Sequence, residues 1–452
     1  MTDVGFRPLA GGAGVSLMSA TPGPDLGAHG YAEAEFSASG VAERFSAGDG
    51  HDVEPIDSAT YTTRIVVRRP TDPARFSGTV VVEWFNVSSG ADAAPEYTYL
   101  ADEIVRAGHA WVGVSAQYDG VVGSSGSVGL DSGVPGGLLG ADAERYGHLT
   151  HPGDAYCYDI FGGVGAALRS IDGPDHPLSG LDVTTLIAVG ESQSAFALTT
   201  YVNLFLPRHR VHDGVLIHSR AAGSLGLGDV GTGADTDATF DQPPTLLRED
   251  LAARVIVVQT ETDVLTNFRF HLARQPDTER LRIWEVAGTA HADLVQIGPY
   301  EEMLGCPHPV NRGQQQFVLR AALHHLVDWV HDTGTRPAPP HAEPLRLRPA
   351  TDPEVFDVDD VGNVLGGVRT PRVDVATELL SGIVDADLPR ICVLFGSTTP
   401  LPADVLRARF DGRADYLDRY RAATDAMIEA GFALAVDRDA LLADANPEPI
   451  DG

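Results

Sequence analysis

A serine between an apolar run and a helical stretch is the feature that points most directly to chemistry. Residues 184–189 (TTLIAV) are typical of a buried strand, and residues 193–206 have helical spacing. Between them lies GESQS (190–194), whose small residues let a strand and a helix approach closely. Such a turn exposes the serine hydroxyl, and the first N–H groups of the helix favour negative charge beside it. The pattern predicts that Ser192 is a nucleophile.

The local pattern is not specific by itself. A second Gly-x-Ser-x-Ser stands at 123–127 (GSSGS), in a Gly- and Ser-rich stretch without a strand before it or a helix after it. A tight turn that binds nothing, or a turn that cradles phosphate in a dinucleotide fold, remains an alternative for Ser192. The context of strand, turn and helix favours the nucleophile.

A serine nucleophile needs a histidine base, and the base needs a carboxylate that orients it. In doubly wound hydrolases these residues follow the serine in the order acid, then histidine. The strand-like run 254–259 is followed by TETD, so Asp263 is the expected acid and Glu261 the alternative. The run 281–286 is followed by AGTAH, which makes His291 the expected base.

An oxyanion hole requires two N–H donors. We expect one from the backbone of Gln193 and the other from Asn86 or Val87, in the loop after the strand-like run 79–85. Aromatic residues close to the predicted sheet edge could line an acyl pocket, although such residues more often belong to a core. The candidates for this pocket are Trp84, Phe85, Tyr118 and Tyr156.

The elements that must position these residues alternate along the chain. Strand-like runs separated by helices predict an α/β fold with a mostly parallel, doubly wound sheet and a few antiparallel strands at one edge. We expect strands over 31–39, 61–68, 79–85, 110–115, 184–189, 213–218, 254–259 and 281–286, and helices over 96–107, 157–170, 193–206 and 313–331.

Three segments interrupt this alternation. Residues 119–139 are rich in Gly and Ser and predict a long loop. Residues 221–244 are polar and Gly-rich without a period, which is typical of an inserted lid or binding loop. The Pro-rich segment 336–344 is typical of a linker. We therefore predict a core over 1–335 and a C-terminal extension over 345–452.

The motifs resemble those of the bacterial "alpha/beta hydrolase domain" family, which carries GESQSA at the elbow, here residues 190–195. Residues 82–92 (VEWFNVSSGAD), 151–161 (HPGDAYCYDIF) and 360–371 (DVGNVLGGVRTP) are similar to further signatures of that family. The resemblance covers most of residues 30–435. It implies an α/β-hydrolase fold, an extension packed on the core, and ester hydrolysis of unspecified substrates.

Composition excludes several classes of enzyme. The chain has 452 residues, a formal net charge of −31, and 32 basic residues that are all arginine. Without lysine, Schiff-base, P-loop and protein-kinase chemistry are excluded. The acidity argues against nucleic acid and anionic membranes as partners, and favours a neutral or cationic small molecule over an anionic one. No cofactor is expected, and the sequence does not indicate an oligomeric state.

The cysteines and the chain's hydropathy suggest a compartment. Cys157, Cys306 and Cys392 are too few for a disulfide framework, so we expect buried free thiols in a cytoplasmic protein, although a bridge within one pair stays open. No Cys/His cluster has zinc spacing, so no metal is expected. We see neither a signal peptide nor an apolar run long enough to span a bilayer.

The sequence therefore predicts a serine carboxylester hydrolase that forms an acyl-enzyme on Ser192 and acts on a small-molecule ester. An acyltransferase or lactonase would use the same three residues with a different acceptor. A hydrolase-fold binding protein without activity is the alternative from another class, and the intact set of Ser, Asp and His argues against it.

Overall fold

The computed structural model describes residues 3–17, 23–48, 50–128, 136–171, 173, 175–332, 338–349 and 354–450. The chain forms two compact units, Met1–Val255 and Ile256–Gly452. The boundary falls within the strand Arg254–Thr260 and not at the predicted linker 336–344. Residues 336 and 337 of that linker lie outside the described part. The predicted division into a core and a C-terminal extension stays a prediction.

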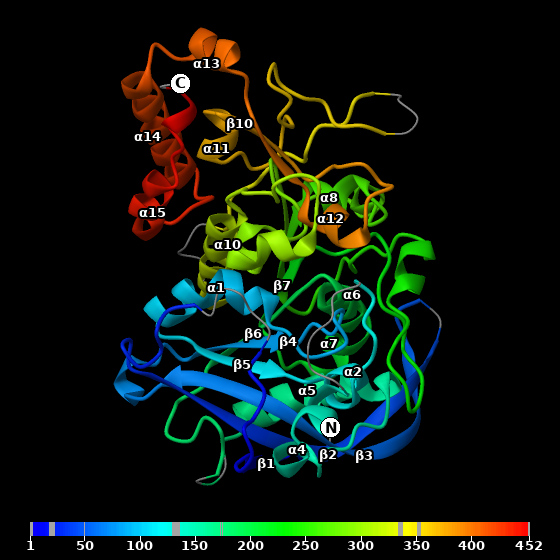
Figure 1. Ribbon diagram of the computed structural model, residues 1–452. Coiled ribbons are helices and arrows are strands. Elements are labelled where there is room, and N and C mark those ends of the chain that lie inside the picture. Colours follow the sequence, from blue (N-terminus) through cyan, green and yellow to red (C-terminus); the bar gives the residue numbers. More distant parts are fainter. Residues whose placement is uncertain are drawn as a thin grey trace. The chain divides into compact units, whose positions relative to one another are not determined.

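The first unit is built on a mixed sheet with the strand order β1-β2-β3-β5-β4-β6-β7 (Figure 1). Neighbouring strands are antiparallel from β1 to β5 and parallel from β5 through β4 and β6 to β7. The strands are β1 (Gly5–Pro8), β2 (Tyr31–Ala47), β3 (Val53–Pro70), β4 (Thr79–Trp84), β5 (Ala110–Val114), β6 (Thr185–Glu191) and β7 (Gly214–His218).

The parallel part of this sheet is the centre of the core. Every residue of β4, β5, β6 and β7 is buried. Val82 of β4 pairs with Val112 of β5 on one side and with Ala188 of β6 on the other. Because both faces of a parallel sheet are covered, its strands are continuous apolar runs, as their sequences predict.

The antiparallel edge is longer than its sequence pattern suggests. β2 has 17 residues and β3 has 18, whereas alternation predicts strands only over 31–39 and 61–68. Ala42 and Phe45, in the extra part of β2, are buried although their neighbours are largely exposed. The register shifts between Arg44 and Phe45, which interrupts the period-2 pattern there. In the first half of β3 no residue from Val53 to Thr60 is buried, so that half has no apolar alternation to recognise.

The longer helices of the first unit lie where the sequence predicts them. The helices of this unit are α1 (Pro95–Arg106), α2 (Tyr118–Val122), α3 (Gly137–Ala141), α4 (Ala143–Tyr146), α5 (Cys157–Arg169), α6 (Gln193–Thr200) and α7 (Leu206–His209), with short 3-10 turns at Pro73–Arg75, Asp154–Tyr156 and Asp237–Asp241. The short helices α2, α3 and α4 were not predicted. The predicted helix 193–206 is interrupted by a π-helical turn over Tyr201–Phe205. The predicted loop 119–139 begins inside α2 and ends inside α3, and residues 129–135 lie outside the described part.

The second unit holds the neighbouring strands β8 (Arg254–Thr260) and β9 (Leu281–Val286), the first of which begins at the boundary. Its helices before the extension are α8 (Glu261–Leu265), α9 (Leu294–Ile297) and α10 (Gln315–His331), with 3-10 turns at Phe270–Ala273 and Gly298–Leu304. Among the described residues, no helix is long and apolar enough to cross a membrane.

The C-terminal extension packs on β9 and on the start of α10. Val286 and Val368 form a parallel bridge, and the Gln314 side chain donates to the Tyr420 hydroxyl at 3.0 Å. The extension contains α11 (Pro371–Asp374), β10 (Glu378–Ser381), α12 (Arg390–Phe395), β11 (Ser397–Pro400), α13 (Ala403–Arg409), α14 (Arg413–Glu429) and α15 (Arg438–Ala443), followed by a 3-10 turn at Glu448–Ile450; β10 and β11 form an antiparallel pair.

The expectation of three free thiols is wrong for two of them. Cys306 and Cys392 form a disulfide with an S–S distance of 2.10 Å, whereas Cys157 is a buried free thiol. Their 86-residue separation hid the pair, because a distant pair of cysteines has no sequence signature. Since disulfides persist in oxidising compartments, the cytoplasmic location expected from sparse cysteines stays a prediction.

Candidate active site

Ser192 lies in a sharp turn between β6 and α6. Its backbone has φ 60° and ψ −123°, a conformation that costs energy for any residue with a Cβ. The Ser192 N–H donates to the carbonyl oxygen of His218 at 3.0 Å, and the Ser192 carbonyl oxygen accepts the N–H of Phe196 at 3.0 Å. Ser192 is half-buried, whereas Glu191 and Gln193 on either side are buried. This geometry is typical of a nucleophile elbow.

The small residues around the serine are required by packing. A Cβ at Gly190 would lie 3.0 Å from the Leu198 Cδ1 atom and 3.0 Å from the Ser194 Cβ atom. The Ser194 hydroxyl donates to the carbonyl oxygen of Glu191 at 2.9 Å, across the turn. A larger residue at either position would separate the strand from the helix, so the spacing of the motif follows from the close approach.

The loop after β4 is joined to the elbow by side-chain hydrogen bonds. The Asn86 side chain donates to the carbonyl oxygen of Glu191 at 3.0 Å, while the Asn86 N–H donates to the Ala93 carbonyl oxygen at 3.0 Å. The Val87 N–H donates to Gln193 Oε1 at a longer 3.4 Å. Of the two donors expected from this loop, Asn86 therefore has its N–H engaged in a backbone hydrogen bond, and Val87 is the better placed.

A buried polar network that sequence reasoning missed supports Gln193. Its side chain donates to Gln117 Oε1 at 2.5 Å, and the Trp84 indole N–H donates to the same oxygen at 3.0 Å. Gln117 in turn donates to Asp154 Oδ2 at 2.9 Å. Burial raises the Asp154 pKa, and the hydrogen bonds that it accepts lower it only partly. Asp154 stands in HPGD (151–154), where nothing in the sequence alone distinguishes it from a turn residue.

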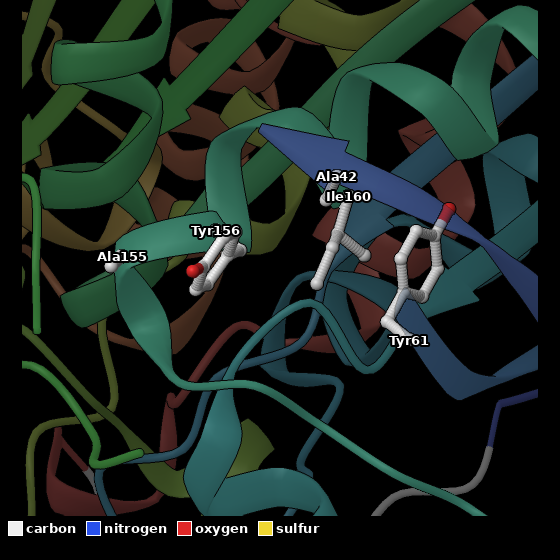
Figure 2. Close-up of a cluster of buried hydrophobic side chains, with 5 residues drawn as sticks. All are labelled: Ala42, Tyr61, Ala155, Tyr156 and Ile160. Atoms are coloured by element: carbon white, nitrogen blue, oxygen red, sulfur yellow. The ribbon is translucent and has the colours of Figure 1, made fainter. Parts of the chain in front are cut away.

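The predicted pocket aromatics are mostly core residues. Figure 2 shows Tyr156 in a buried cluster with Ala42, Tyr61, Ala155 and Ile160, and its hydroxyl donates to Asp57 at 2.9 Å. This placement favours packing and runs against the expectation that Tyr156 lines an acyl pocket.

Trp84 and Phe85 also have core surroundings. The Trp84 ring packs on Phe161 with a centroid distance of 4.7 Å, and the Phe85 ring lies 5.9 Å from that of Trp111. Both Trp84 and Phe85 are fully buried, whereas Tyr118 is only half-buried and its ring faces His151. Tyr118, the first residue of α2, is therefore the only one of the four predicted pocket aromatics that is not buried.

Arg220 organises the base of the predicted lid. It follows Ser219, which has a positive φ of 57°, and is itself 1% exposed. Its guanidinium donates to the carbonyl oxygens of Ala221, Ala222 and Thr245, so it joins the two ends of the 221–244 segment. Burial lowers the Arg220 pKa to about 9. The sequence offered no signal for this residue.

The predicted lid is also docked along its length. The Gly231 N–H donates to the Pro152 carbonyl oxygen at 2.8 Å, and the Ala234 N–H donates to Asp154 Oδ2 at 2.8 Å. Apart from the 3-10 turn at 237–241, the segment has no regular structure. Its contacts fix its course within the first unit, and its role as a lid stays a prediction.

A buried cluster of Glu96, Glu191 and His218 lies behind the elbow. His218 Nδ1 and Glu96 Oε2 are 2.9 Å apart, and ligand-type atoms of all three residues lie within 4.8 Å of one another. Among the described residues this group has the donor types and spacing to hold a metal ion. The hydrogen bond to Glu96 also holds His218 in place, and the His218 carbonyl oxygen accepts the Ser192 N–H.

The expected acid and base lie together in the second unit. His291 Nδ1 and Asp263 Oδ1 are 2.7 Å apart, and both side chains are buried. A carboxylate only accepts hydrogen bonds, so this contact places the proton on Nδ1 and leaves Nε2 as an acceptor. The Phe268 ring lies 4.6 Å from the imidazole, centroid to centroid. The structure thus pairs His291 with Asp263.

The other oxygen of Asp263 belongs to the cap of α8. Thr260 donates to Asp263 Oδ2 from its N–H at 2.8 Å and from its hydroxyl at 2.7 Å. Burial by itself raises the Asp263 pKa, but attraction to His291 and the hydrogen bonds from His291 and Thr260 outweigh it, so the pKa is lowered. Asp263 therefore stays ionised through the neutral range beside the imidazole.

Glu261, the alternative acid, has different partners. Its Oε1 accepts the N–H of Gly288 at 2.6 Å, and its Oε2 accepts the N–H of Gly382 at 2.8 Å. Gly288 belongs to the segment 287–293 that carries His291, called the His loop below. Glu261 therefore contacts the backbone of that loop and leaves the imidazole to Asp263.

The predicted site residues are divided between the two compact units. Ser192, Gln193, Asn86 and Val87 belong to the first unit, and Asp263 and His291 to the second. Within each unit the structure brings together the residues that the sequence singled out. Two hollows of the first unit, of about 430 and 540 Å³, are lined by other residues, from the N-terminal segment, β2, β3 and α4 with its flanks.

A family model described as "Alpha/beta hydrolase domain" matches residues 6–443, nearly the whole chain. No curated protein matches the chain.

Several solved structures are similar to parts of it. A putative dienelactone hydrolase from Klebsiella pneumoniae subsp. pneumoniae is 12% identical over 65% of this chain and 98% of that chain, with a TM-score of 0.32. XC6422 from Xanthomonas campestris, an α/β serine hydrolase without a lid, is 14% identical over 54% and 85%, with a TM-score of 0.30. Est1E from Butyrivibrio proteoclasticus is 8% identical over 64% and 99%, with a TM-score of 0.33.

Proposed function

Since this chain belongs to the family of alpha/beta hydrolase domains, we propose that it is a serine hydrolase that cleaves a small carboxylic ester through an acyl-enzyme on Ser192. The observation that carries the proposal is the strained, half-buried serine between a buried strand and a helix. The His291–Asp263 pair in the second unit supports it, because such a pair is what a serine nucleophile requires.

In the proposed reaction, His291 acts as the general base. Asp263 holds the proton on Nδ1, so the lone pair of Nε2 accepts the proton of the Ser192 hydroxyl as its oxygen attacks the ester carbonyl. The imidazolium then gives that proton to the departing alcohol. A water molecule attacks the acyl-enzyme by the same route, which releases the carboxylic acid and restores the serine.

The oxyanion of each tetrahedral intermediate is proposed to bind two backbone N–H groups. Gln193 is the first residue of α6, where N–H groups have no carbonyl partner within the helix. Val87 is the second donor, since its 3.4 Å hydrogen bond to Gln193 Oε1 is long enough to be exchanged for a stronger bond to an oxyanion.

For the substrate, we propose a small neutral or cationic ester. The net charge of −31 disfavours the approach of an anion. Tyr118, with its half-buried ring beside His151, is the proposed pocket aromatic, and the docked 221–244 segment is the proposed lid. The location in the cytoplasm and the absence of macromolecular partners remain expectations.

The proposal is tested by replacing the serine. Ser192→Ala should abolish hydrolysis of p-nitrophenyl acetate, a loss of about 10⁴-fold or more in kcat, without unfolding the protein. The matched control is Ser125→Ala, which changes the exposed serine of the second Gly-x-Ser-x-Ser and should leave kcat unchanged. Equal activity of the two variants would rule out Ser192 as the nucleophile.

A further inference from the structure

The C-terminal extension holds the His loop on both sides of the proposed base. Before His291, the Ala287 N–H donates to the Val368 carbonyl oxygen at 3.0 Å. After it, the Ala292 N–H donates to the Leu394 carbonyl oxygen at 3.0 Å. Two backbone carbonyls of the extension thus flank the histidine, which gives the extension a direct influence on where the imidazole lies.

A single buried carboxylate joins these segments. Glu261, at the start of α8, accepts the N–H of Gly288 in the His loop with one oxygen and the N–H of Gly382 in the extension with the other. The Thr262 hydroxyl donates to the Gly382 carbonyl oxygen at 2.7 Å, so this glycine is held at both ends. A Cβ at Gly382 would lie 2.4 Å from the Thr289 carbonyl oxygen, which shows how closely the extension approaches the loop.

The negative charge on the buried Glu261 carboxyl is costly in neutral solution. Burial raises the Glu261 pKa to about 7, although its hydrogen bonds from Gly382 and Gly288 and the attraction of Arg369 lower it. A carboxyl whose pKa is raised on folding contributes stability at low pH, and this contribution is lost as the pH rises through the folded pKa. Above pH 7 the buried charge therefore costs free energy, which points to a role in function.

The charged form is nevertheless the one that fits both neighbours. Each oxygen of the carboxylate faces one N–H donor. Protonation converts one oxygen into a hydroxyl, and glutamine would place an amide NH₂ there, so in either case a donor faces a donor. One of the two bonds is then weakened, and Gly288 or Gly382 loses a fixed partner.

We propose that Glu261 is a positioning residue for catalysis: its carboxylate ties the Gly288 turn to the C-terminal extension and so holds His291 in place on Asp263. The inference rests on the proposed function, because it assigns Glu261 a task in the reaction of His291. It makes the extension a part of the catalytic machinery, which the sequence did not reveal.

The direct test is Glu261→Gln in the full-length chain, assayed with p-nitrophenyl acetate at pH 8. Misplacing a catalytic group by about 1 Å costs up to about 10²-fold in rate, so kcat should fall by about 10- to 100-fold. KM should stay within about twofold, since the substitution is expected to misplace the base in the transition state and not to change substrate binding. The melting temperature at pH 8 should stay close to that of the wild type, because the substitution removes a buried charge.

Glu285→Gln is the matched control. Glu285 is another buried carboxylate that holds the extension, because it accepts the Leu345 N–H at 2.8 Å. It differs from Glu261 in its partner, which is Arg274. Within the described part of the chain, its side chain has no hydrogen bond to the His loop. This variant should lower the melting temperature and leave kcat nearly unchanged. A loss of kcat without a loss of melting temperature in Glu261→Gln, together with the reverse in Glu285→Gln, would show that Glu261 positions the base and does not only help to pack the extension.

The pH profile gives a second readout. Arg369 in the extension is the charged group whose attraction acts on the Glu261 carboxyl, and Asp263, two residues along α8, is paired with His291 in the His loop. Both His291 and Glu261 must lose a proton for full activity, so the acid limb of log kcat against pH should approach a slope of 2 in the wild type. In Glu261→Gln it should approach a slope of 1.

Thr262→Val keeps the test decisive if Glu261→Gln fails to fold. It removes only the hydroxyl bond to Gly382, and kcat should fall by about 3- to 10-fold, as expected for one hydrogen bond, with KM unchanged. The inference would be overturned if Glu261→Gln kept the wild-type kcat and the wild-type acid limb. If Glu261→Gln does not fold, a wild-type kcat in Thr262→Val would overturn it instead. A wild-type protein that hydrolyses no ester would instead overturn the proposed function.

Discussion

Asp263 uses its two carboxylate oxygens for different purposes. One contacts His291 Nδ1 at 2.7 Å, and the other accepts two hydrogen bonds from Thr260 at the start of α8. The same residue therefore orients the proposed base and caps a helix. These two roles can be separated by substitution, because only the first affects the tautomer of the imidazole.

Asp263→Asn should reduce kcat for p-nitrophenyl acetate by about 10⁴-fold. With its oxygen kept on Thr260, the amide presents an NH₂ to Nδ1, which forces the proton onto Nε2 and removes the acceptor for the serine proton. The companion variant Thr260→Ala should lower stability by about 0.5–2 kcal/mol, as for a lost cap, with kcat within about tenfold of the wild type. Near-normal turnover in Asp263→Asn would mean that another group orients His291.

The sequence could not decide between the two acids. Glu261 and Asp263 follow the same strand and are two residues apart, so chain order favours neither strongly. The choice depends on which side chain points to His291 and which to the glycines at 288 and 382, and those glycines are distant in sequence. For Ser192 and His291 the position after a recognisable strand was sufficient to single them out.

At the scale of elements, the covalent link between Cys306 and Cys392 joins the segment after the His loop to α12. The carbonyl oxygen of Leu394, in that helix, accepts the N–H of Ala292 beside His291. Val310 and Phe395 pack with Ala292 in one buried cluster. The disulfide therefore restrains the part of the extension that flanks the proposed base.

Replacing both cysteines by serine should lower the free energy of unfolding by about 2–4 kcal/mol, the usual effect of a disulfide that closes a long loop. The measurement is denaturant unfolding of the double variant and of the wild type, each with and without a reducing agent. The reducing agent should destabilise the wild type only. Cys157→Ala is the control, since that thiol is not part of a disulfide, and equal stability of the oxidised and reduced wild type would contradict the prediction.

The parallel strands and most of the longer helices were predictable because burial on both faces leaves continuous apolar runs, as in β4 and β6. The interruption of the 193–206 helix by a π turn was not, since Tyr201–Phe205 has the apolar spacing of an ordinary helix. The 221–244 segment was recognised as irregular, but its docking on residues 152–155 depends on backbone hydrogen bonds that composition does not encode.

At the scale of the whole molecule, alternating strands and helices predicted a mostly parallel α/β sheet, and the resemblance of the motifs implied the α/β-hydrolase fold, which the family match over residues 6–443 confirms. The net charge of −31 is the other property of the whole chain. Exposed ion pairs contribute about 0–1 kcal/mol each, so repulsion among the excess acidic groups dominates the surface electrostatics.

Added salt should therefore stabilise the protein. Raising NaCl from about 0.01 M to about 0.1 M shortens the Debye length from about 30 Å to about 10 Å and screens this repulsion. At pH 8 the melting temperature should rise by at least about 2 °C, which corresponds to about 1 kcal/mol for domains of 150–250 residues. Near the sequence pI of about 4.7 the same salt step should have little effect, and a larger effect there than at pH 8 would contradict the argument.

The central claim, that Ser192 is an activated nucleophile, is tested most directly by a fluorophosphonate probe. The folded wild-type protein should gain one covalent adduct, located by peptide mass spectrometry on Ser192, and His291→Ala should be labelled far more slowly because no base then accepts the serine proton during the attack. Absence of an adduct on Ser192 in folded protein, or an adduct on a different serine, would contradict the account.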